Sequence, residues 1–279
     1  MTTTLRPSEP LQQSADGVRS RAYDICVNSR RVGSVRLATD PGFGPAAGLI
    51  EDLGVDEPDR GRGRGAVAAL AGEEVLRGWG CTEVTVSVPA DAAAALRLAR
   101  SLGYTERSRN MLKDLPDTAP ELPVGVVARP MGEREFAVWS ERTKDAFAQS
   151  WIERGVPEDQ ARAKAEDSHR RYLPDGLATP GTDVYVAVVA GAVVGFLWTG
   201  AIEVRPGERT AFVYEVEVAE AHRGRGYGRA LMLLAERLAL AAGERRLGLH
   251  VFAGNTPAIG LYESLGYRTT LVNSAKTLR

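Results

Sequence analysis

Apolar positions in the C-terminal half of the chain switch repeatedly between strand spacing and helical spacing. Short apolar runs predict strands over 124–129, 184–189, 193–198, 211–218, 247–252 and 267–271. Phe136, Trp139, Phe147 and Trp151 recur at helical intervals and predict a helix over 133–154. Further helices are expected over 158–172, 224–242 and 256–265, with Pro157 suited to a first turn and glycines after the last two. The order βααβββαβαβ predicts a mixed α/β layer architecture.

The N-terminal half contains the later elements of this series without its opening. Strands are expected over 22–27, 32–37, 49–55, 83–88 and 104–112, and helices over 65–78 and 92–102. Only about 20 residues precede the first hairpin here, whereas about 60 residues with two helices precede the matching hairpin in the C-terminal half. We therefore expect a truncated first copy of one fold.

An internal repeat supports the two-copy interpretation. Ser-Leu-Gly-Tyr at 101–104 recurs at 264–267, and the Arg-Gly-rich segment 60–65 recurs at 223–228, both at an offset of 163. Val32-Gly33 against Val194-Gly195 gives 162, so one residue was gained or lost between these points. The segment 114–123 holds three prolines and three acids, which indicates an extended linker. We expect a degenerate domain over 1–113, a linker over 114–123 and a catalytic domain over 124–279, each domain a splayed mixed sheet flanked by helices.

Composition narrows the class of protein. The 279 residues carry a net charge of −1, which disfavours nucleic acid and membrane surfaces as partners, although arginines cluster at 60–64 and 223–229 and suggest a small anionic ligand. Only two cysteines are present, and we see no signal peptide and no long apolar run. His169, His222 and His250 lack metal-ligand spacing. A cytoplasmic, metal-free protein, monomeric or homodimeric, is therefore expected.

The arginine-rich turn after the middle strands has the features of an anion site. Amides that open a helix are unpaired and carry the positive end of its dipole, so they bind phosphate, and glycines allow close approach. A Rossmann fingerprint is disfavoured because the turn does not follow the first strand, and the Gly-Lys-Ser/Thr of a P-loop is absent. A plain glycine-rich connector with solvated arginines stays open as the alternative.

Two motifs in the C-terminal copy resemble the GNAT superfamily of N-acetyltransferases. One is R-x-x-G-x-G from Arg223 to Gly228, and the other is N-x-x-A-x-x-L-Y-x-x-x-G-Y from Asn255 to Tyr267. The tandem layout is similar to that of mycothiol synthases and other two-copy actinobacterial members. The resemblance implies acetyl-CoA held between the fourth and fifth strands with its pyrophosphate on the first motif. The residues it implies for the cofactor are Val216, Val218, Arg223, Gly224, Arg225, Gly226, Tyr227, Gly228, Arg229 and Asn255.

Direct attack of a primary amine on a thioester, through a tetrahedral intermediate, needs a base, an oxyanion donor and an acid for the thiolate. The resemblance implies that Tyr262 is the acid and that the Val216 amide, at a strand bulge, is the oxyanion donor. Tyr262 could instead be an ordinary helix residue with a satisfied hydroxyl. Glu215 and Glu217, on one face of the strand, and His250 on the next strand stay open as bases, with solvated side chains as the alternative.

The repeat offset indicates that the first copy is inactive. Ala99 stands where the second copy has Tyr262, Ala92 where it has Asn255, and Ser87 where it has His250, although Asp52 matches Glu215. We therefore expect a structural first copy, with a phosphate loop that could still hold CoA.

The acceptor is expected to be a small-molecule or peptide amine. Candidate wall residues from the resemblance are Trp139, Phe147, Trp151 and Tyr172, although helical spacing also suits plain core aromatics. Two further functions stay open: a non-catalytic acyl-CoA sensor or interaction module, and a mycothiol-synthase-like acetyltransferase. Tyr262 and Glu215 speak against a sensor, because binding alone needs neither.

Overall fold

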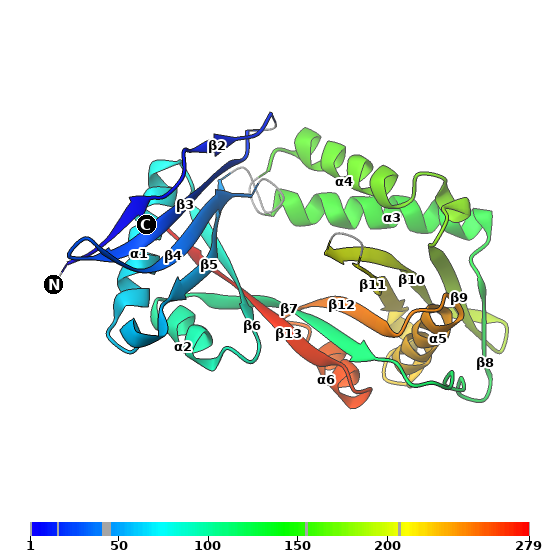
Figure 1. Cartoon of the computed structure of the whole chain (residues 1–279). Coiled ribbons are helices and arrows are strands. Elements are labelled where there is room, and N and C mark those ends of the chain that lie inside the picture. Colours follow the sequence, from blue (N-terminus) through cyan, green and yellow to red (C-terminus); the bar gives the residue numbers. More distant parts are fainter. Residues whose placement is uncertain (1, 16, 41–45, 154–155, 206–207, 279) are drawn as a thin grey trace. The chain divides into compact units, whose positions relative to one another are not determined.

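The protein is described by a computed structural model that covers residues 2–15, 17–40, 46–153, 156–205 and 208–278 (Figure 1). The chain forms two compact units, Met1–Ser108 with Leu271–Arg279 and Arg109–Thr270. The architecture is mixed α/β with six α-helices in the described part of the chain. The chain passes between the units inside two strands, β7 (Thr105–Asp114) and β13 (Arg268–Thr277).

The larger unit contains most of the second copy. Its sheet runs in the order β7-β12-β11-β10-β9-β8, formed by β8 (Val126–Pro130), β9 (Asp183–Val189), β10 (Ala192–Arg205), β11 (Glu208–Val218) and β12 (Arg246–Phe252). Helix α5 (Tyr227–Ala241) covers one face, and α3 (Glu133–Ile152) and α4 (Glu158–Tyr172) cover the other (Figure 1). Helix α6 (Thr256–Ser264) follows β12. Each expected helix and strand of this half occurs, although α5 begins at Tyr227 and not at 224, and β10 and β13 extend beyond 198 and 271. Arg154 lies outside the described residues.

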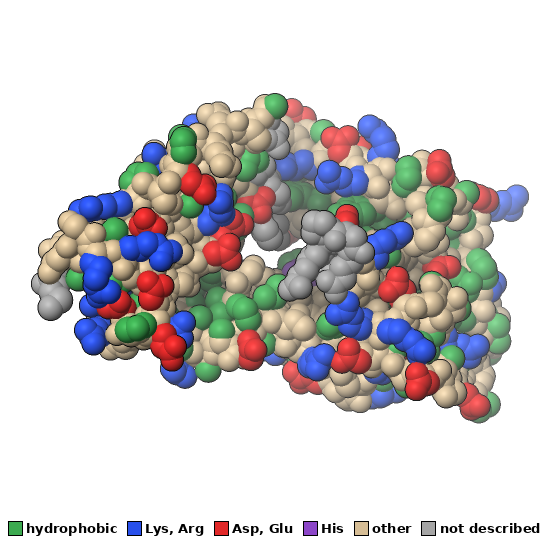
Figure 2. Space-filling model, viewed as in Figure 1, with side chains coloured by type: hydrophobic (Ala, Val, Ile, Leu, Met, Phe, Trp, Pro, Cys, Tyr) green, Lys and Arg blue, Asp and Glu red, His purple; other side chains and the backbone are tan. Residues whose placement is uncertain are grey.

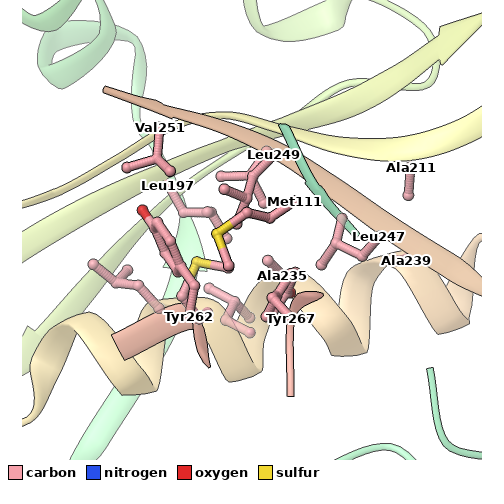
Figure 3. Close-up of a cluster of buried hydrophobic side chains, with 14 of the residues drawn as sticks. Met111, Leu197, Ala211, Ala235, Ala239, Leu247, Leu249, Val251, Tyr262 and Tyr267 are labelled. Atoms are coloured by element: carbon pink, nitrogen blue, oxygen red, sulfur yellow. The ribbon is translucent and has the colours of Figure 1, made fainter. Parts of the chain in front are cut away.

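Apolar side chains from both sides of the strands build this unit's core. The α5 face fully buries Leu231, Met232 and Leu247. Tyr262 from α6 belongs to the same cluster and is seen with Leu247 in Figure 3. The α3 face has its own cluster around Trp139, which lies against Trp198 at a ring-centroid distance of 5.7 Å. The sheet is therefore buried on both faces, which explains the near-continuous apolar runs in its strands.

The smaller unit repeats the later elements. Its sheet contains β1 (Thr3–Pro7), β3 (Arg19–Val27), β4 (Arg30–Thr39), β5 (Ala47–Val55) and β6 (Glu83–Pro89) in that order, with β2 (Gln12–Gln13) paired to β3. Helices α1 (Arg64–Gly78) and α2 (Ala93–Ser101) follow β5 and β6. The two short strands β1 and β2 were not expected from the sequence, and no helix precedes the hairpin in the described residues.

The final strands of the two copies are exchanged between the units. In the smaller unit, Leu271–Thr277 of β13 pairs antiparallel with Pro89–Glu83 of β6. In the larger unit, β7 of the first copy lies beside β12 and contributes Met111 to the core (Figure 3). Each unit is therefore completed by a strand that belongs, by sequence repeat, to the other copy.

Between β7 and β8, residues 115–125 form neither helix nor strand. The exchange means that the compact units do not follow the copies of the repeat, and the domain boundary at 114–123 stays a prediction.

Candidate active site

Two neighbouring strands in the sheet of the larger unit, β11 and β12, separate from each other along part of their length. The described parallel pairing joins Ala211–Val213 of β11 to Leu247–Leu249 of β12, although both strands continue, to Val218 and Phe252. Side chains at alternate positions of these continuations point to opposite faces. The unpaired stretch is therefore a gap that groups from both faces of the sheet can line.

The loop after β11 presents helix amides without a cap. Gly226 is the N-cap of α5 at φ 83°, Gly224 has φ 75°, and no side chain caps the helix. A Cβ added at either glycine would meet no atom within 4 Å, so the space beside the loop is open. Arg223 Nε donates to Val218 O at 3.2 Å and fixes the start of the loop. This arrangement suits an anion such as a diphosphate.

The other cofactor candidates surround this loop in different ways. Arg225 is exposed, whereas Arg229 donates to Ser264 Oγ at 2.5 Å and so links α5 to α6. Gly228 allows close packing of the two helices, since a Cβ there would lie 3.2 Å from Leu261. Asn255 caps α6, with Oδ1 accepting from the Ala258 amide at 3.3 Å, as expected from the sequence. Tyr227 lies edge-on to His222, with 6.3 Å between the ring centroids.

Strand β11 contains a bulge at Tyr214. Trp198 of β10 pairs with Glu215 and Thr199 pairs with Val213, so Tyr214 is the extra residue. The bulge expected at Val216 is wrong, because Val216 pairs in register with Leu197. Glycine at position 200 opens the space for the extra side chain, since a Cβ there would lie 2.9 Å from the Tyr214 ring.

Glu215 is the most strongly perturbed carboxyl on this strand. Burial, and secondarily the charge of Glu217, raise its pKa from the ordinary 4.5 to about 7. A hydrogen bond from Thr143 Oγ1 at 3.3 Å lowers the same pKa by a smaller amount. Glu217 lies on the same face, as expected, and binds Arg142 at 3.1 Å. A carboxyl with a pKa near neutrality is suited to general-base work, and Thr143 is a partner that sequence patterns did not reveal.

Tyr262 lies on the α5 face of the sheet. Its side chain is buried in the core cluster with Val251 and Leu197, and burial raises its pKa (Figure 3). Its hydroxyl has no hydrogen-bond partner among the described residues, so the alternative of a satisfied hydroxyl receives no support from the described contacts. A neutral phenol with a free O–H can donate a proton to an acceptor placed beside it.

His250 follows Leu249, where the strand pairing ends. Its neighbours Leu249 and Val251 point into the α5-side core, so strand alternation puts His250 on the face of Glu215. The imidazole is exposed and its centroid lies 5.3 Å from that of the Phe252 ring, yet the surrounding protein lowers its pKa. It is therefore neutral near pH 7 and also capable of accepting a proton.

The four aromatic candidates for an acceptor wall separate into two groups. Tyr172 lies 5.2 Å from Tyr214, and Trp139 contacts Trp198, so both lie on the Glu215 face. Phe147 and Trp151 contact each other at 6.0 Å, and Trp151 belongs to a separate α3–α4 cluster. The Tyr214 ring, which the bulge brings to this face and which stacks on Trp198 at 4.8 Å, had no signal in the sequence.

The first copy keeps the loop and loses the reactive side chains. Gly61 and Gly63 have φ 72° and 73°, and Arg60 Nε donates to Val55 O at 2.8 Å, as in the second copy. Ala99 is partly buried and packs against the apolar core of its unit, and Ala92 caps α2 without a side-chain hydrogen bond. The first copy therefore offers no phenol at the position of Tyr262.

The start of α1 also differs in charge from the start of α5. The buried Asp59 carboxylate binds Arg30 at 2.7 and 2.9 Å and also pairs with the buried Arg64. Arg64, a cation of this turn, is therefore paired with a carboxylate inside the protein.

Comparisons with known proteins follow the two copies. The model of the Acetyltransferase (GNAT) family matches residues 3–104 and 141–267. The chain belongs to this family. An uncharacterized N-acetyltransferase, YycN of Bacillus subtilis, is 32% identical over 156 residues, which are 55% of this chain and 99% of that protein.

Other relatives extend over both copies. A mycothiol acetyltransferase of Streptomyces griseus is 31% identical over 269 residues, 91% of this chain and 78% of that protein. The crystal structure of a GCN5-related N-acetyltransferase from Sphaerobacter thermophilus superposes with a TM-score of 0.58 at 22% identity, covering 92% and 81% of the two chains. The alignment with the mycothiol acetyltransferase thus spans both segments that the family model matches, and the chain is an enzyme of the acetyltransferase type.

In the described part of the chain, no helix is both long and apolar enough to cross a bilayer, and no group of three His, Cys, Asp or Glu side chains is placed to hold a metal ion. Basic and acidic side chains are interspersed on the face in Figure 2.

Proposed function

We propose that the protein is an N-acetyltransferase that moves an acetyl group from acetyl-CoA to a primary amine, with all chemistry in the second copy. The uncapped start of α5 beside the strand gap carries the proposal. Its amides and open glycines suit the diphosphate of CoA, and Arg223 and Arg225 add positive charge next to it. The acyl arm would then lie along Val216 and Val218 with Asn255 beside it.

The amine would reach the thioester from the α3 face. Acetyl-CoA supplies the activated acyl group, and Glu215, with a pKa of about 7, accepts the proton of the incoming amine directly or through water. Glu217 and His250 are the remaining candidates on the same face, and the Val216 amide is the proposed oxyanion donor.

Tyr262 would protonate the departing thiolate from the α5 face. Its hydroxyl is free of protein partners in the described residues, and its raised pKa keeps it protonated at neutral pH. We expect Tyr262→Phe to lower kcat by about 10²-fold, the lower end for a general acid, with little change in the Kd of acetyl-CoA. Single-turnover thiol release and calorimetric titration measure the two quantities, and a kcat equal to that of the unchanged protein would refute the role of Tyr262.

The amine acceptor defines the decisive screen. Incubating the full chain with acetyl-CoA and a panel of small-molecule and peptide amines, while reading free thiol, tests the activity. The similarity to mycothiol acetyltransferases puts the amine that those enzymes acetylate in the panel. Tight acetyl-CoA binding without turnover on any amine would favour an acyl-CoA sensor instead.

A further inference from the structure

A lysine of the first copy is partly buried in the unit that carries the candidate site. Lys113, on β7, places its Nζ 2.7 Å from Glu236 Oε1 and 5.7 Å from the centroid of the Tyr267 ring. The lysine side chain is 17% exposed and the glutamate 1%. A carboxylate so deeply buried needs a charged partner, and β7 supplies it.

The partners of this lysine belong to the two helices of the candidate site. Glu236 is on α5, which opens at the proposed diphosphate loop. Tyr267 follows α6, and its amide donates to Tyr262 O at 3.0 Å, with the two rings 6.0 Å apart. A Cβ at Gly266 would lie 3.9 Å from Lys113 Cε, so the lysine stem packs against the end of α6.

The same three residue types recur in the smaller unit, where the lysine comes from the last strand of the second copy. Lys276, on β13, binds Glu73 at 2.7 Å and lies 5.7 Å from the ring centroid of Tyr104. All three are 163 positions from their counterparts Lys113, Glu236 and Tyr267. Here α2 carries Ala99 where α6 carries Tyr262. The chain thus contains a matched arrangement without the phenol.

We propose that Lys113 is a positioning residue for acetyl transfer: by joining Glu236 to the end of α6 it fixes the Tyr262 helix relative to the diphosphate loop. The first copy then serves the reaction through its last strand. This inference rests on the proposed function, since it assumes that Tyr262 and the α5 loop act on acetyl-CoA. Lys276 would hold Glu73 in the smaller unit in the same way, without any effect on acetyl transfer.

The test compares Lys113→Met with Lys276→Met in the full chain. Both substitutions leave a buried carboxylate without its cation, so both are expected to lower the melting temperature by similar amounts. At a temperature where both variants are folded, we expect Lys113→Met to lower kcat about tenfold and Lys276→Met to leave it within twofold. Lys113→Arg, which keeps the charge, is expected to restore most of the turnover.

A second pair of variants removes the unpaired charge from the comparison. One double variant combines Lys113→Met with Glu236→Gln, and the other combines Lys276→Met with Glu73→Gln. Neither contains an unpaired buried ion, and they replace the single variants if either of those fails to fold. Equal kcat values in the matched pair, whether both unchanged or both lowered, would overturn the positioning role. Absence of thiol release by the unchanged protein would instead refute the proposed function itself.

Discussion

Replacing Glu215 by glutamine separates the stability of the protein from its activity. The carboxyl is partly buried and close to Glu217, and these two causes raise its pKa to about 7. A group whose pKa is higher in the folded state than in the unfolded chain stabilises the fold below the unfolded pKa, and that contribution is lost as the pH rises through the folded pKa. The relevant window is therefore about pH 4.5 to about pH 7.

The magnitude follows from the displacement of the pKa. A rise from 4.5 to about 7 corresponds to about 3 kcal/mol in the free energy of unfolding, the cost of holding the carboxylate ionised in the folded protein. Glutamine cannot ionise, so Glu215→Gln should be more stable than the unchanged protein by up to about 3 kcal/mol at pH 8 and equal to it near pH 4.

Activity should change in the opposite direction. The unchanged protein should show an acid limb near pH 7 in kcat/KM, because only ionised Glu215 accepts the amine proton. Glu215→Gln should lose this limb and lower kcat by about 10²-fold. Urea denaturation at pH 4, 6 and 8 measures stability, and initial rates of thiol release over the same range measure activity.

Two results would refute this reasoning. Equal stability of the two proteins at pH 8 would mean that the Glu215 carboxylate is not held at a cost in the fold. An acid limb that persists unchanged in Glu215→Gln would transfer the role of base to Glu217 or His250.

The remaining predictions concern the neighbouring charge and the loop. Glu217→Gln removes a negative charge that raises the Glu215 pKa, and it frees Arg142, so the acid limb of kcat/KM should move to lower pH. The half-exposed Arg142–Glu217 ion pair, at 3.1 Å, contributes at most about 1 kcal/mol to the free energy of unfolding. Gly226→Ala places a Cβ at φ 83°, which costs roughly 1–2 kcal/mol, and should raise the KM for acetyl-CoA roughly tenfold in steady-state assays. Gly63→Ala, at φ 73° in the first copy, is the control and should lower stability without changing that KM; an equal effect of both would show that the α5 loop has no special role.

The order of elements could be read from the sequence because apolar spacing and the repeat agreed. The 163-residue offset matched Gly63 to Gly226 and Ala99 to Tyr262, and the equivalent loops adopt the same left-handed glycine conformations. Capping by Asn255 was likewise predictable, because an asparagine before an apolar helix accepts from its first amides.

The strand exchange was not predictable from these patterns. A repeat shows that β7 and β13 are equivalent, but equivalence in sequence does not determine which unit each strand completes. Glu73, Tyr104 and Lys113 each recur 163 positions later as the same residue type, which marks a shared arrangement but not which copy supplies the lysine to which unit. The bulge at Tyr214 left no signal either, since it depends on space beside Gly200 in the neighbouring strand.

The proposed acetyl transfer depends most directly on where the diphosphate of CoA binds. A crystal structure of the full chain with CoA should show the diphosphate within hydrogen-bond distance of the amides that follow Gly226, with Arg223 or Arg225 beside it. A complex in which CoA is bound elsewhere, or in which protein atoms fill the space beside Gly224 and Gly226, would contradict the proposal.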